Sequence, residues 1–314
     1  MSDYSSEVYE PAIAYEALRA FGIADYRLGD PYFGSNVVVR VEAASAYALR
    51  LHRARSVHAI TRELEVIIGL HAAGGLVVAP PVADPQGRYC RTVHSNGRGV
   101  HCTLLRWLPG ASRGPGNGFG PVAARQTGEA LGQIHRYARS RASRGAFEDD
   151  LRLSRLIGDA DELTEQDVRL RELLPELQAR CDQLIALSPE VGTIHGDFIL
   201  KNLLIRRGSV AVLDFDDCCT ERMVFDFAGL LENLDGARRE AQLVDAVLEG
   251  YAAPGPPAAT TAAAVREHTQ SLKAVRHLAG IRWAVGMRAE GRIEQAFFER
   301  VTTYRGNELR RLLS

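Results

Sequence analysis

Two acidic motifs in the second half of the sequence contain the residue types that phosphoryl transfer needs. Residues 195–202 (HGDFILKN) hold the pattern His-x-Asp-x-x-x-x-Asn, and residues 213–217 (LDFDD) hold Asp-Phe-Asp. An attacking hydroxyl needs a carboxylate that orients it and accepts its proton, and both motifs contain carboxylates. A magnesium ion between nucleotide phosphates needs hard oxygen ligands, which Asn202 and Asp214 can supply.

The positions of these residues allow one loop and one hairpin to bring them together. Asp197 and Asn202 are close enough in the sequence for a short loop to turn between them, so that both side chains face one cleft. Residues 206–208 (RRG) predict a turn, and the strand-like residues 209–215 after it would run back along the chain. We therefore expect Asp214 to lie beside Asn202.

The elements that must position these motifs differ between the two halves of the chain. The first half has mostly strand patterns, with a hairpin turn predicted at residues 96–97 (NG). Residues 109–121 are rich in Gly and Pro and predict a loop, after which helical patterns dominate. The predicted strands are residues 37–41, 47–52, 88–93 and 99–107. The predicted helices are residues 13–22, 62–72, 122–138, 159–187, 226–252 and 262–312, the last two joined by the Pro- and Ala-rich residues 252–259.

Composition and charge exclude several classes of protein. The 314 residues are 46% hydrophobic and 25% charged with a net charge of −1, which are ordinary values for a globular protein. This charge gives no general attraction to nucleic acid or to a membrane, and no apolar run reaches the ~20 residues that cross a bilayer. The polar N-terminus (MSDYSSEVYE) is not a secretory signal, and the cysteines form no CxxC pair. We therefore expect a cytoplasmic protein that binds neither nucleic acid nor membranes.

The two motifs in this order, HGDF…N…LDFDD…FDFA, resemble the catalytic loop and the metal-binding motif of the protein-kinase-like fold. Their form is similar to that of the aminoglycoside phosphotransferase and choline kinase group of small-molecule kinases. Eukaryotic protein kinases usually have Arg where Gly196 stands, DFG where residues 214–216 read DFD, and an APE motif that this sequence lacks. The resemblance implies an α+β, two-lobed protein-kinase-like fold. A small, antiparallel, β-rich nucleotide-binding lobe would occupy residues 1–107, and a larger, mostly helical catalytic and substrate-binding lobe would occupy residues 108–314.

The resemblance also implies a role for each acidic residue of the two motifs. Asp197 would be the catalytic base, and Asn202 and Asp214 would hold Mg²⁺. Asp216 is a further candidate for contact with the metal or the substrate. Asp226, in the segment FDFA, matches the aspartate that braces the catalytic loop at the start of a helix.

In the first lobe, the resemblance implies residues that bind the nucleotide. Arg50 lies in the segment ALRL, where the group usually has a phosphate-binding lysine, and arginine keeps the positive charge. Glu63 on the following helix, or its competitor Glu65, would hold Arg50 in position. The segment LLRWL resembles the strand that meets the adenine, and Arg106 within it is a further nucleotide-binding candidate. A phosphate-covering turn, for which an ordinary hairpin turn is the alternative, is expected at Gly34, Ser35 and Asn36.

The reaction implied by this resemblance is transfer of the γ-phosphate of ATP, or of GTP, to a hydroxyl of a small molecule, with Mg²⁺ as cofactor. An aminoglycoside-like or other amine-bearing acceptor, as in an antibiotic-resistance kinase, is the leading prediction. A homoserine- or amino-alcohol-type metabolic kinase is the alternative. A catalytically silent nucleotide-binding pseudokinase is the alternative from another class, because Arg50 replaces the usual lysine and Ile199 replaces a polar residue of the loop. We expect a monomer or a homodimer.

A cationic acceptor would need carboxylates on the second lobe. The sequence after Asp226 has several acidic residues at helical positions, although such a run is usually a face turned to solvent. These residues are Glu232, Asp235, Glu240, Asp245 and Glu249.

Overall fold

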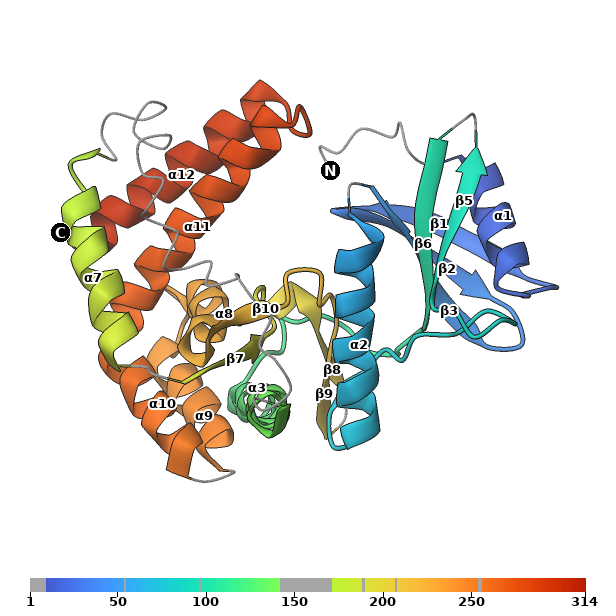
Figure 1. Cartoon of the computed structure of the whole chain (residues 1–314). Helices are drawn as coiled ribbons and strands as arrows, with labels where there is room; N and C mark the ends of the chain where they lie inside the picture. The colour runs from blue at the N-terminus through green and yellow to red at the C-terminus, as the bar shows by residue number, and fades with distance from the viewer. Residues whose placement is uncertain are drawn as a thin grey trace. The chain divides into compact units, whose positions relative to one another are not determined.

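The computed structural model describes residues 10–53, 55–95, 98–141, 171–187, 190–206, 208–253 and 256–314. These residues form two compact units, Met1–Pro109 and Gly110–Ser314, each with its own elements (Figure 1). The turn predicted at residues 96–97 and the first part of the helix predicted at residues 159–187 lie outside the described residues. No helix among the described residues is long and apolar enough to span a membrane.

A five-stranded antiparallel sheet forms the centre of the first unit. Its strands are arranged in the order β1-β2-β3-β6-β5, so that each predicted strand pairs with a neighbour. Alternate residues of a strand point to opposite faces of the sheet, and the β-branched side chains of Val37, Val39 and Val41 all enter the core on one face. The strands are β1 (Arg27–Phe33), β2 (Asn36–Glu42), β3 (Ala46–His52), β5 (Cys90–Ser95) and β6 (Arg98–Arg106).

Two helices complete the first unit. Helix α1 (Pro11–Ala20) places its apolar face in the same core as the valines of β2. Helix α2 (Val57–Ala73) begins earlier than predicted, because the Ser56 hydroxyl caps its first turn by accepting from the Ala59 N–H. It ends at Gly74, whose φ of 72° is a left-handed conformation that glycine adopts without strain. The two-residue strand β4 (Val77–Val78) follows.

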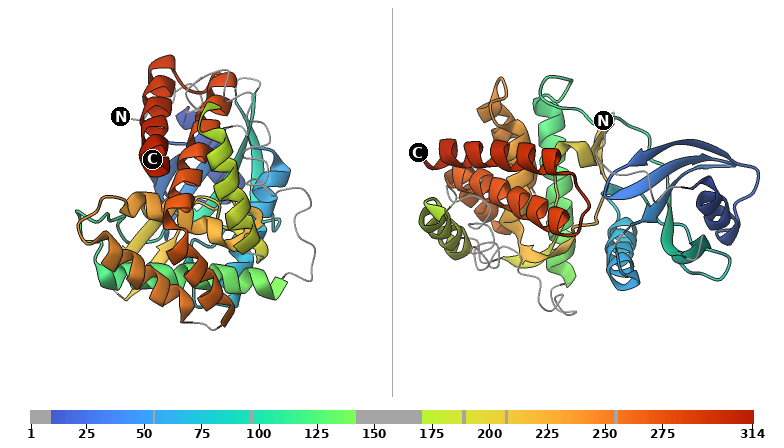
Figure 2. Two further views of the ribbon diagram at one scale, coloured as in Figure 1. Left: turned by 90° about the vertical axis from the view of Figure 1, so that its left-hand side faces the viewer. Right: turned by 90° about the horizontal axis from the view of Figure 1, so that it is seen from above.

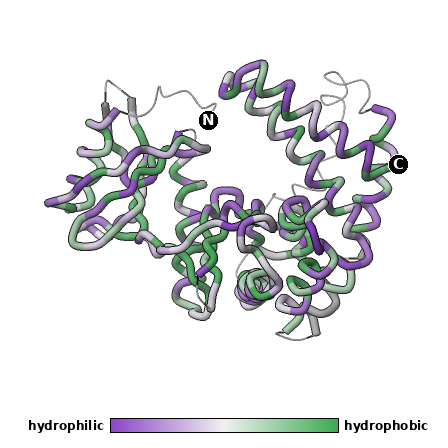
Figure 3. The backbone as a smooth tube through the Cα atoms, turned by 180° about the vertical axis from the view of Figure 1, so that it is seen from behind, coloured by the Kyte–Doolittle hydropathy of each residue, from purple (hydrophilic) through white to green (hydrophobic). Residues whose placement is uncertain are grey.

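The second unit is mostly helical, with two short antiparallel strand pairs among the helices. The pairs are β7 (Val191–Ile194) with β10 (Cys219–Arg222), and β8 (Leu203–Arg206) with β9 (Ser209–Val212). The long helices α11 and α12 lie side by side, and both alternate between apolar and polar residues along their length (Figures 2 and 3). The helices are α3 (Pro121–Arg141), α7 (Leu174–Leu187), α8 (Asp226–Leu234), α9 (Glu240–Ala252), α10 (Pro256–Glu267), α11 (Thr269–Ala289) and α12 (Gln295–Leu313), with 3-10 turns at Leu200–Asn202 and Met223–Phe225.

Helices α3 and α9 pack so closely that glycine is required where they meet. A Cβ atom on Gly128 would lie 1.9 Å from the carbonyl oxygen of Val247, and one on Gly250 would lie 2.0 Å from that of Arg125. Real Cβ atoms do not approach so near, so each glycine allows the backbone of one helix to touch the other. This contact fixes α9 against α3, and both helices contribute side chains to the site described below.

Two of the helices predicted in the second unit are wrong as continuous elements. The segment predicted as one helix at residues 226–252 breaks between α8 and α9, where Gly236 has a φ of 67° and Arg239 a φ of 69°. The segment predicted at residues 262–312 is divided among α10, α11 and α12, and Gly291, with a φ of 67°, lies in the last break. A residue in the left-handed conformation ends a helix. The helical spacing of apolar residues continues on both sides of such a break, so the sequence pattern does not show it. The segment predicted to join these two helices, residues 252–259, is shorter than predicted, because α10 already begins at Pro256. Proline in the first turn of a helix costs no backbone hydrogen bond.

Candidate active site

The first acidic motif follows strand β7, and the second precedes strand β10. Ile194, at the end of β7, pairs with Cys219, at the start of β10, so the two motifs leave the same strand pair side by side. The hairpin of β8 and β9 returns the chain as predicted, and the Leu213 N–H donates to the carbonyl of Asn202 at 2.9 Å. Asp214 is the next residue, which places it beside Asn202 as the sequence predicted.

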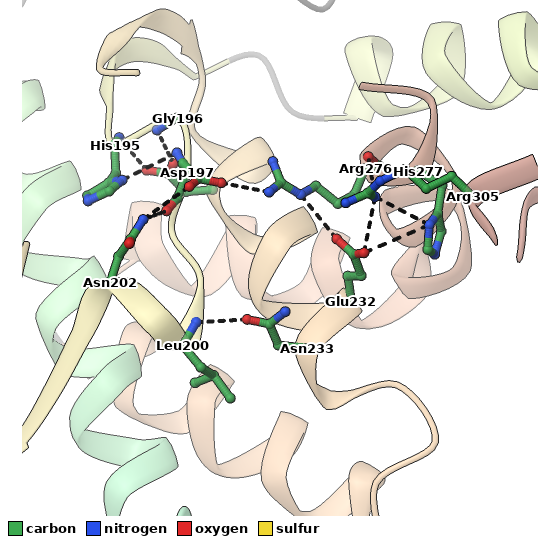
Figure 4. Close-up of polar contacts among 11 residues, drawn as sticks. His195, Gly196, Asp197, Leu200, Asn202, Glu232, Asn233, Arg276, His277 and Arg305 are labelled. Atoms are coloured by element: carbon green, nitrogen blue, oxygen red, sulfur yellow. Dashed lines mark hydrogen bonds and ion pairs between the residues drawn. The ribbon is translucent and has the colours of Figure 1, made fainter. Parts of the chain in front are cut away.

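The Asp197 carboxylate is held by donors on both oxygens (Figure 4). Its Oδ2 accepts a hydrogen bond from Asn202 Nδ2 at 3.1 Å, and the same nitrogen donates to the Asp197 carbonyl at 2.9 Å. Its Oδ1 accepts from Nη2 of Arg276 at 2.6 Å. Because both partners of Asn202 Nδ2 are acceptors, the orientation of the amide is fixed, and Asn202 Oδ1 does not face Asp197.

His195 holds the shape of the loop through its ring. Its Nε2 lies 2.9 Å from the Leu213 carbonyl, which can only accept, so Nε2 carries the proton. Nδ1 then accepts from the Asp197 N–H at 3.3 Å. The ring is fully buried and lies 4.6 Å from the ring of Phe215. Both ring nitrogens are therefore engaged with the backbone, which suits a packing residue better than one that transfers protons.

Asp226 ties the loop to three other elements, in the bracing position that the resemblance implied. Its Oδ2 accepts from the His195 N–H and its Oδ1 from the Gly196 N–H, each at 2.8 Å. On the other side, Nε2 of His135 in α3 lies 3.0 Å from Oδ2, and Nδ1 of His135 lies 2.8 Å from the hydroxyl of Tyr251 in α9. One buried carboxylate therefore connects the loop, α8, α3 and α9 (the last through His135).

The charges around Asp226 keep it ionised despite complete burial. Burial by itself would raise the pKa of Asp226, but the hydrogen bond from His135 and the nearby loop N–H of His195 hold this pKa below its ordinary value. Burial raises the pKa of Tyr251 to about 12, so its hydroxyl keeps the proton that it can donate to His135.

Two features of the loop backbone depend on particular residues. Gly196 has a φ of 83°, and a Cβ there would lie 2.1 Å from the carbonyl oxygen of Asp217. No side chain fits this position, so the Arg that protein kinases carry here is excluded by the backbone of this chain. At the other end of the loop, the Leu200 N–H donates to Oδ1 of Asn233 in α8 at 2.8 Å.

The predicted metal residues Asp214 and Asp216 follow strand β9, close in the chain to the backbone contact with Asn202. Asp214 is half-buried with a φ of 61°, a left-handed conformation that a residue other than glycine rarely adopts and that often marks functional sites. Asp216 is also half-buried. The described residues hold no group of three or more His, Cys, Asp or Glu side chains that could bind a metal alone. An amide oxygen from Asn202 and one or two carboxylates fit Mg²⁺, which takes few protein ligands when phosphates and water supply the rest.

In the first unit, the structure brings together Arg50 and Glu63. Arg50 points to the opposite face of the sheet from its neighbours Leu49 and Leu51, and its Nη1 donates to Glu63 Oε1 of α2 at 2.5 Å. The second oxygen of Glu63 accepts from Arg55. Glu63 is fully buried, which selects it over the exposed Glu65 as the partner of Arg50.

The remaining predicted residues of the first unit lie at strand ends. Gly34 and Ser35 form the turn between β1 and β2, where the Gly34 N–H donates to the Asn36 carbonyl at 3.0 Å, and the Asn36 side chain is buried. Arg106 ends β6 and is exposed, with its guanidinium 4.9 Å from the ring centre of Tyr47. Their contact with a nucleotide stays a prediction.

Three residues around Asp197, namely Arg276, Glu232 and Arg305, were not predicted from the sequence or had no predicted role. Arg276, on α11, also donates from Nε to Glu232 Oε2 at 3.2 Å, and Arg305 on α12 donates to Glu232 Oε1 at 3.1 Å. Arg276 and Asp197 are 79 residues apart, and no local pattern marks Arg276 among the many arginines of the chain. In the sequence, Glu232 stood out only as one of the acidic residues that follow Asp226.

Glu232 and several other carboxylates line a pocket of about 520 Å³. Its lining includes four acidic side chains and two basic ones, and it includes three of the five acidic residues noted in the sequence. Lys273 is almost fully buried, and its Nζ donates to Asp235 at 2.6 Å and to Glu240 at 2.5 Å. The charged lining residues are Glu232, Asp235, Glu240, Glu308, Lys273 and Arg311. Asp245 and Glu249 do not line the pocket, and both are exposed.

One protein-family model and several solved structures match this chain. A family model described as the phosphotransferase enzyme family matches residues 33–262. Comparison with curated protein sequences gives no match.

Solved structures of several kinases share the fold. A microcompartment-associated aminopropanol kinase has 21% identity and a TM-score of 0.73, with 96% of this chain and 95% of that chain covered. An amicoumacin kinase in complex with AMP-PNP and Ca²⁺ has 17% identity and a TM-score of 0.68, with 96% and 94% covered. A choline kinase from Cryptosporidium parvum has 12% identity and a TM-score of 0.61, with 96% and 95% covered. These similarities confirm the predicted α+β, protein-kinase-like fold, and with the family match they show that this chain belongs to the phosphotransferase enzyme family.

Proposed function

We propose that the protein is an ATP-dependent O-phosphotransferase that moves the γ-phosphate to a hydroxyl of a small, amine-bearing molecule. The observation that carries this proposal is the geometry of Asp197. Its carboxylate is only 16% exposed and is oriented by Asn202 and Arg276, which suits a group that must meet one hydroxyl in one direction. GTP is an alternative donor.

Asp197 orients the acceptor hydroxyl and accepts its proton as the oxygen attacks the terminal phosphorus. When bound, Mg²⁺ would neutralise charge on the nucleotide phosphates, held by Oδ1 of Asn202 and the carboxylate of Asp214, with Asp216 as a further candidate ligand. In the first unit, Arg50 binds phosphate oxygens, and its pairing with buried Glu63 keeps its guanidinium in one orientation. Catalysis on this account is mostly positioning and electrostatic stabilisation.

The carboxylate-rich pocket supports an acceptor that carries an amine. Four carboxylates line it together with Lys273 and Arg311, so an ammonium group seated there could pair with carboxylate oxygens in competition with these cations. Glu232, which holds Arg276 beside Asp197, also lines this pocket, so an acceptor seated there would lie close to the proposed base. An aminoglycoside-like acceptor of the kind modified in antibiotic resistance fits this chemistry.

A compact amino alcohol is the second candidate. All four carboxylates of the pocket already pair with lysine or arginine, which leaves little room for a polycation. Asp235 and Glu240 bind Lys273, Glu232 binds Arg276 and Arg305, and Glu308 binds Arg311. The similarity in fold to an aminopropanol kinase agrees with this choice.

The proposal is tested by measuring ADP release with Mg²⁺-ATP across a panel of aminoglycosides, amino alcohols, hydroxy amino acids and neutral sugars. We expect turnover with at least one amine-bearing alcohol and none with its deaminated analogue. Asp197→Asn should lose at least about 10³-fold in kcat while calorimetry shows unchanged nucleotide binding. Asp182→Asn, an exposed aspartate on α7, is the matched control and should keep full activity. Full activity in Asp197→Asn contradicts the proposal.

A further inference from the structure

Arg276 places a fixed positive charge beside the proposed catalytic base (Figure 4). Its Nη2 donates to Asp197 Oδ1 at 2.6 Å and its Nε donates to Glu232 Oε2 at 3.2 Å. A guanidinium has five N–H groups in a planar fork, and these two bonds use two of them. Its Nη1 donates to no acceptor in the described part of the chain, and the side chain remains 21% exposed.

The position of Arg276 is set by a second ion pair behind it. Glu232 accepts from Arg276 with one oxygen and from Arg305 Nη1 with the other, at 3.1 Å. Arg305 also donates to the backbone carbonyl of Arg276 at 3.5 Å, which links α12 to α11 at this point. Burial alone would lower the pKa of Arg276, but Asp197 and Glu232 raise this pKa above its ordinary value, so the guanidinium stays charged. Because Asp197 and Glu232 hold the Arg276 guanidinium from two sides, its charge is preorganised to stabilise negative charge that develops nearby.

The loop itself gives Asp197 no such cation. The three residues that follow Asp197 are Phe198, Ile199 and Leu200, and all are buried and apolar. Lys201 comes next and is exposed, with no ion pair to any described residue. The terminal phosphoryl group carries negative charge on its equatorial oxygens during transfer, and a nearby cation lowers the energy of that state. Among the described residues of the second unit, the cation that contacts the base therefore comes from α11.

We propose that Arg276 is a catalytic residue that orients Asp197 through Nη2 and donates its remaining N–H groups to the phosphoryl oxygens during transfer. This inference rests on the proposed function. In the step itself, the acceptor oxygen bonds to the γ-phosphorus and the bond from that phosphorus to the β–γ bridging oxygen breaks. The hydroxyl proton passes to Asp197 and ADP leaves with the electron pair of the broken bond. Arg276 keeps its protons throughout.

The test compares Arg276→Ala and Arg276→Lys with wild type on an acceptor identified by ADP release. For Arg276→Ala we expect kcat to fall about 10²–10³-fold, with the KM values for nucleotide and acceptor changed by less than about 3-fold. Guanidinium chloride at a low, non-denaturing concentration should restore part of this kcat in Arg276→Ala and have no effect on wild type. Arg276→Lys should be intermediate, because an ammonium keeps the charge but not the fork.

Arg266→Ala is the matched control, since Arg266 is exposed on α10 and pairs only with exposed Asp245 among the described residues. It should keep wild-type kcat and should not respond to guanidinium. If Arg276→Ala does not fold, as judged by its thermal transition, Arg276→Lys carries the test, with a kcat loss of at least about 10-fold expected.

Three results would overturn the inference. A kcat within about 3-fold of wild type in Arg276→Ala shows that the charge is not used in the reaction. A raised acceptor KM at unchanged kcat shows that Arg276 binds an anionic group of the acceptor instead. A lost kcat that guanidinium does not restore shows a structural role only. These results leave the proposed function intact, whereas a wild-type protein without any transfer overturns both.

Discussion

Replacing Asp226 by Asn tests whether one buried carboxylate holds the catalytic loop in place. The carboxylate accepts from the N–H groups of His195 and Gly196 and from Nε2 of His135. An asparagine keeps one accepting oxygen and turns an NH2 group toward a donor, so at least one of the three hydrogen bonds is lost and the others lose their charge assistance. Each such bond contributes about 1.5–3 kcal/mol, while the neutral amide costs less to bury than the carboxylate. We therefore expect the free energy of unfolding to fall by about 3 kcal/mol.

Urea unfolding of the full chain measures this loss, and thermal unfolding should show a midpoint about 6–12 °C lower. The folded-state pKa of Asp226 is below its unfolded value, so the stability it contributes is present above about pH 4 and is lost as the pH falls through the folded pKa. Asp226→Asn should lack this part of the acid sensitivity. Asp182→Asn, the exposed control, should change stability by less than about 0.5 kcal/mol. A loss below about 1 kcal/mol in Asp226→Asn would refute the argument that this carboxylate braces the loop.

The remaining predictions concern helix packing and one histidine. Gly128→Ala should destabilise the protein by about 3 kcal/mol or more in urea unfolding, because its Cβ would meet a carbonyl of α9 at 1.9 Å. Gly286 lies on an exposed face of α11, where an added Cβ would meet nothing within 4 Å, so Gly286→Ala should stabilise the protein by about 0.5–1 kcal/mol. Equal changes in unfolding free energy for Gly128→Ala and Gly286→Ala would contradict the packing of α3 against α9. Burial holds the pKa of His277 below its ordinary 6.5, so wild type should lose stability as the pH falls below about 6.5, where only the unfolded chain gains the proton. In thermal unfolding, the stability of His277→Gln should fall less than that of wild type between pH 7 and pH 5. The same pH dependence in both proteins would contradict a lowered pKa of His277.

Local sequence patterns were sufficient to predict the residues of the acidic motifs and the hairpin between them. Asn202 and Asp214 are separated by one turn, and the β-branched and apolar residues on both sides of that turn specify its strands. The family resemblance offered Glu63 or Glu65 as the partner of Arg50, and the structure selects Glu63. Features of this kind depend on neighbours in the sequence, which a pattern of residue types records.

The contacts that the sequence did not reveal depend on tertiary packing. Arg276 reaches Asp197 only because α11 packs against α8, and helical periodicity says nothing about which distant loop a given arginine meets. The break after α8 was missed for a related reason, since the apolar spacing continues through Gly236 into α9 and only the backbone conformation shows the interruption. The bonds of His135 to Asp226 and Tyr251 become visible only when three elements are assembled.

The most direct test of the account is to locate the metal in crystals grown with Mn²⁺ and a non-hydrolysable ATP analogue, using the anomalous signal of manganese. The account predicts a manganese peak about 2 Å from Oδ1 of Asn202 and from a carboxylate oxygen of Asp214, with further ligands from the nucleotide phosphates. Asp197 should point at the terminal phosphate. A peak that lies away from Asn202 and Asp214, or a terminal phosphate out of reach of Asp197, would contradict the central claim.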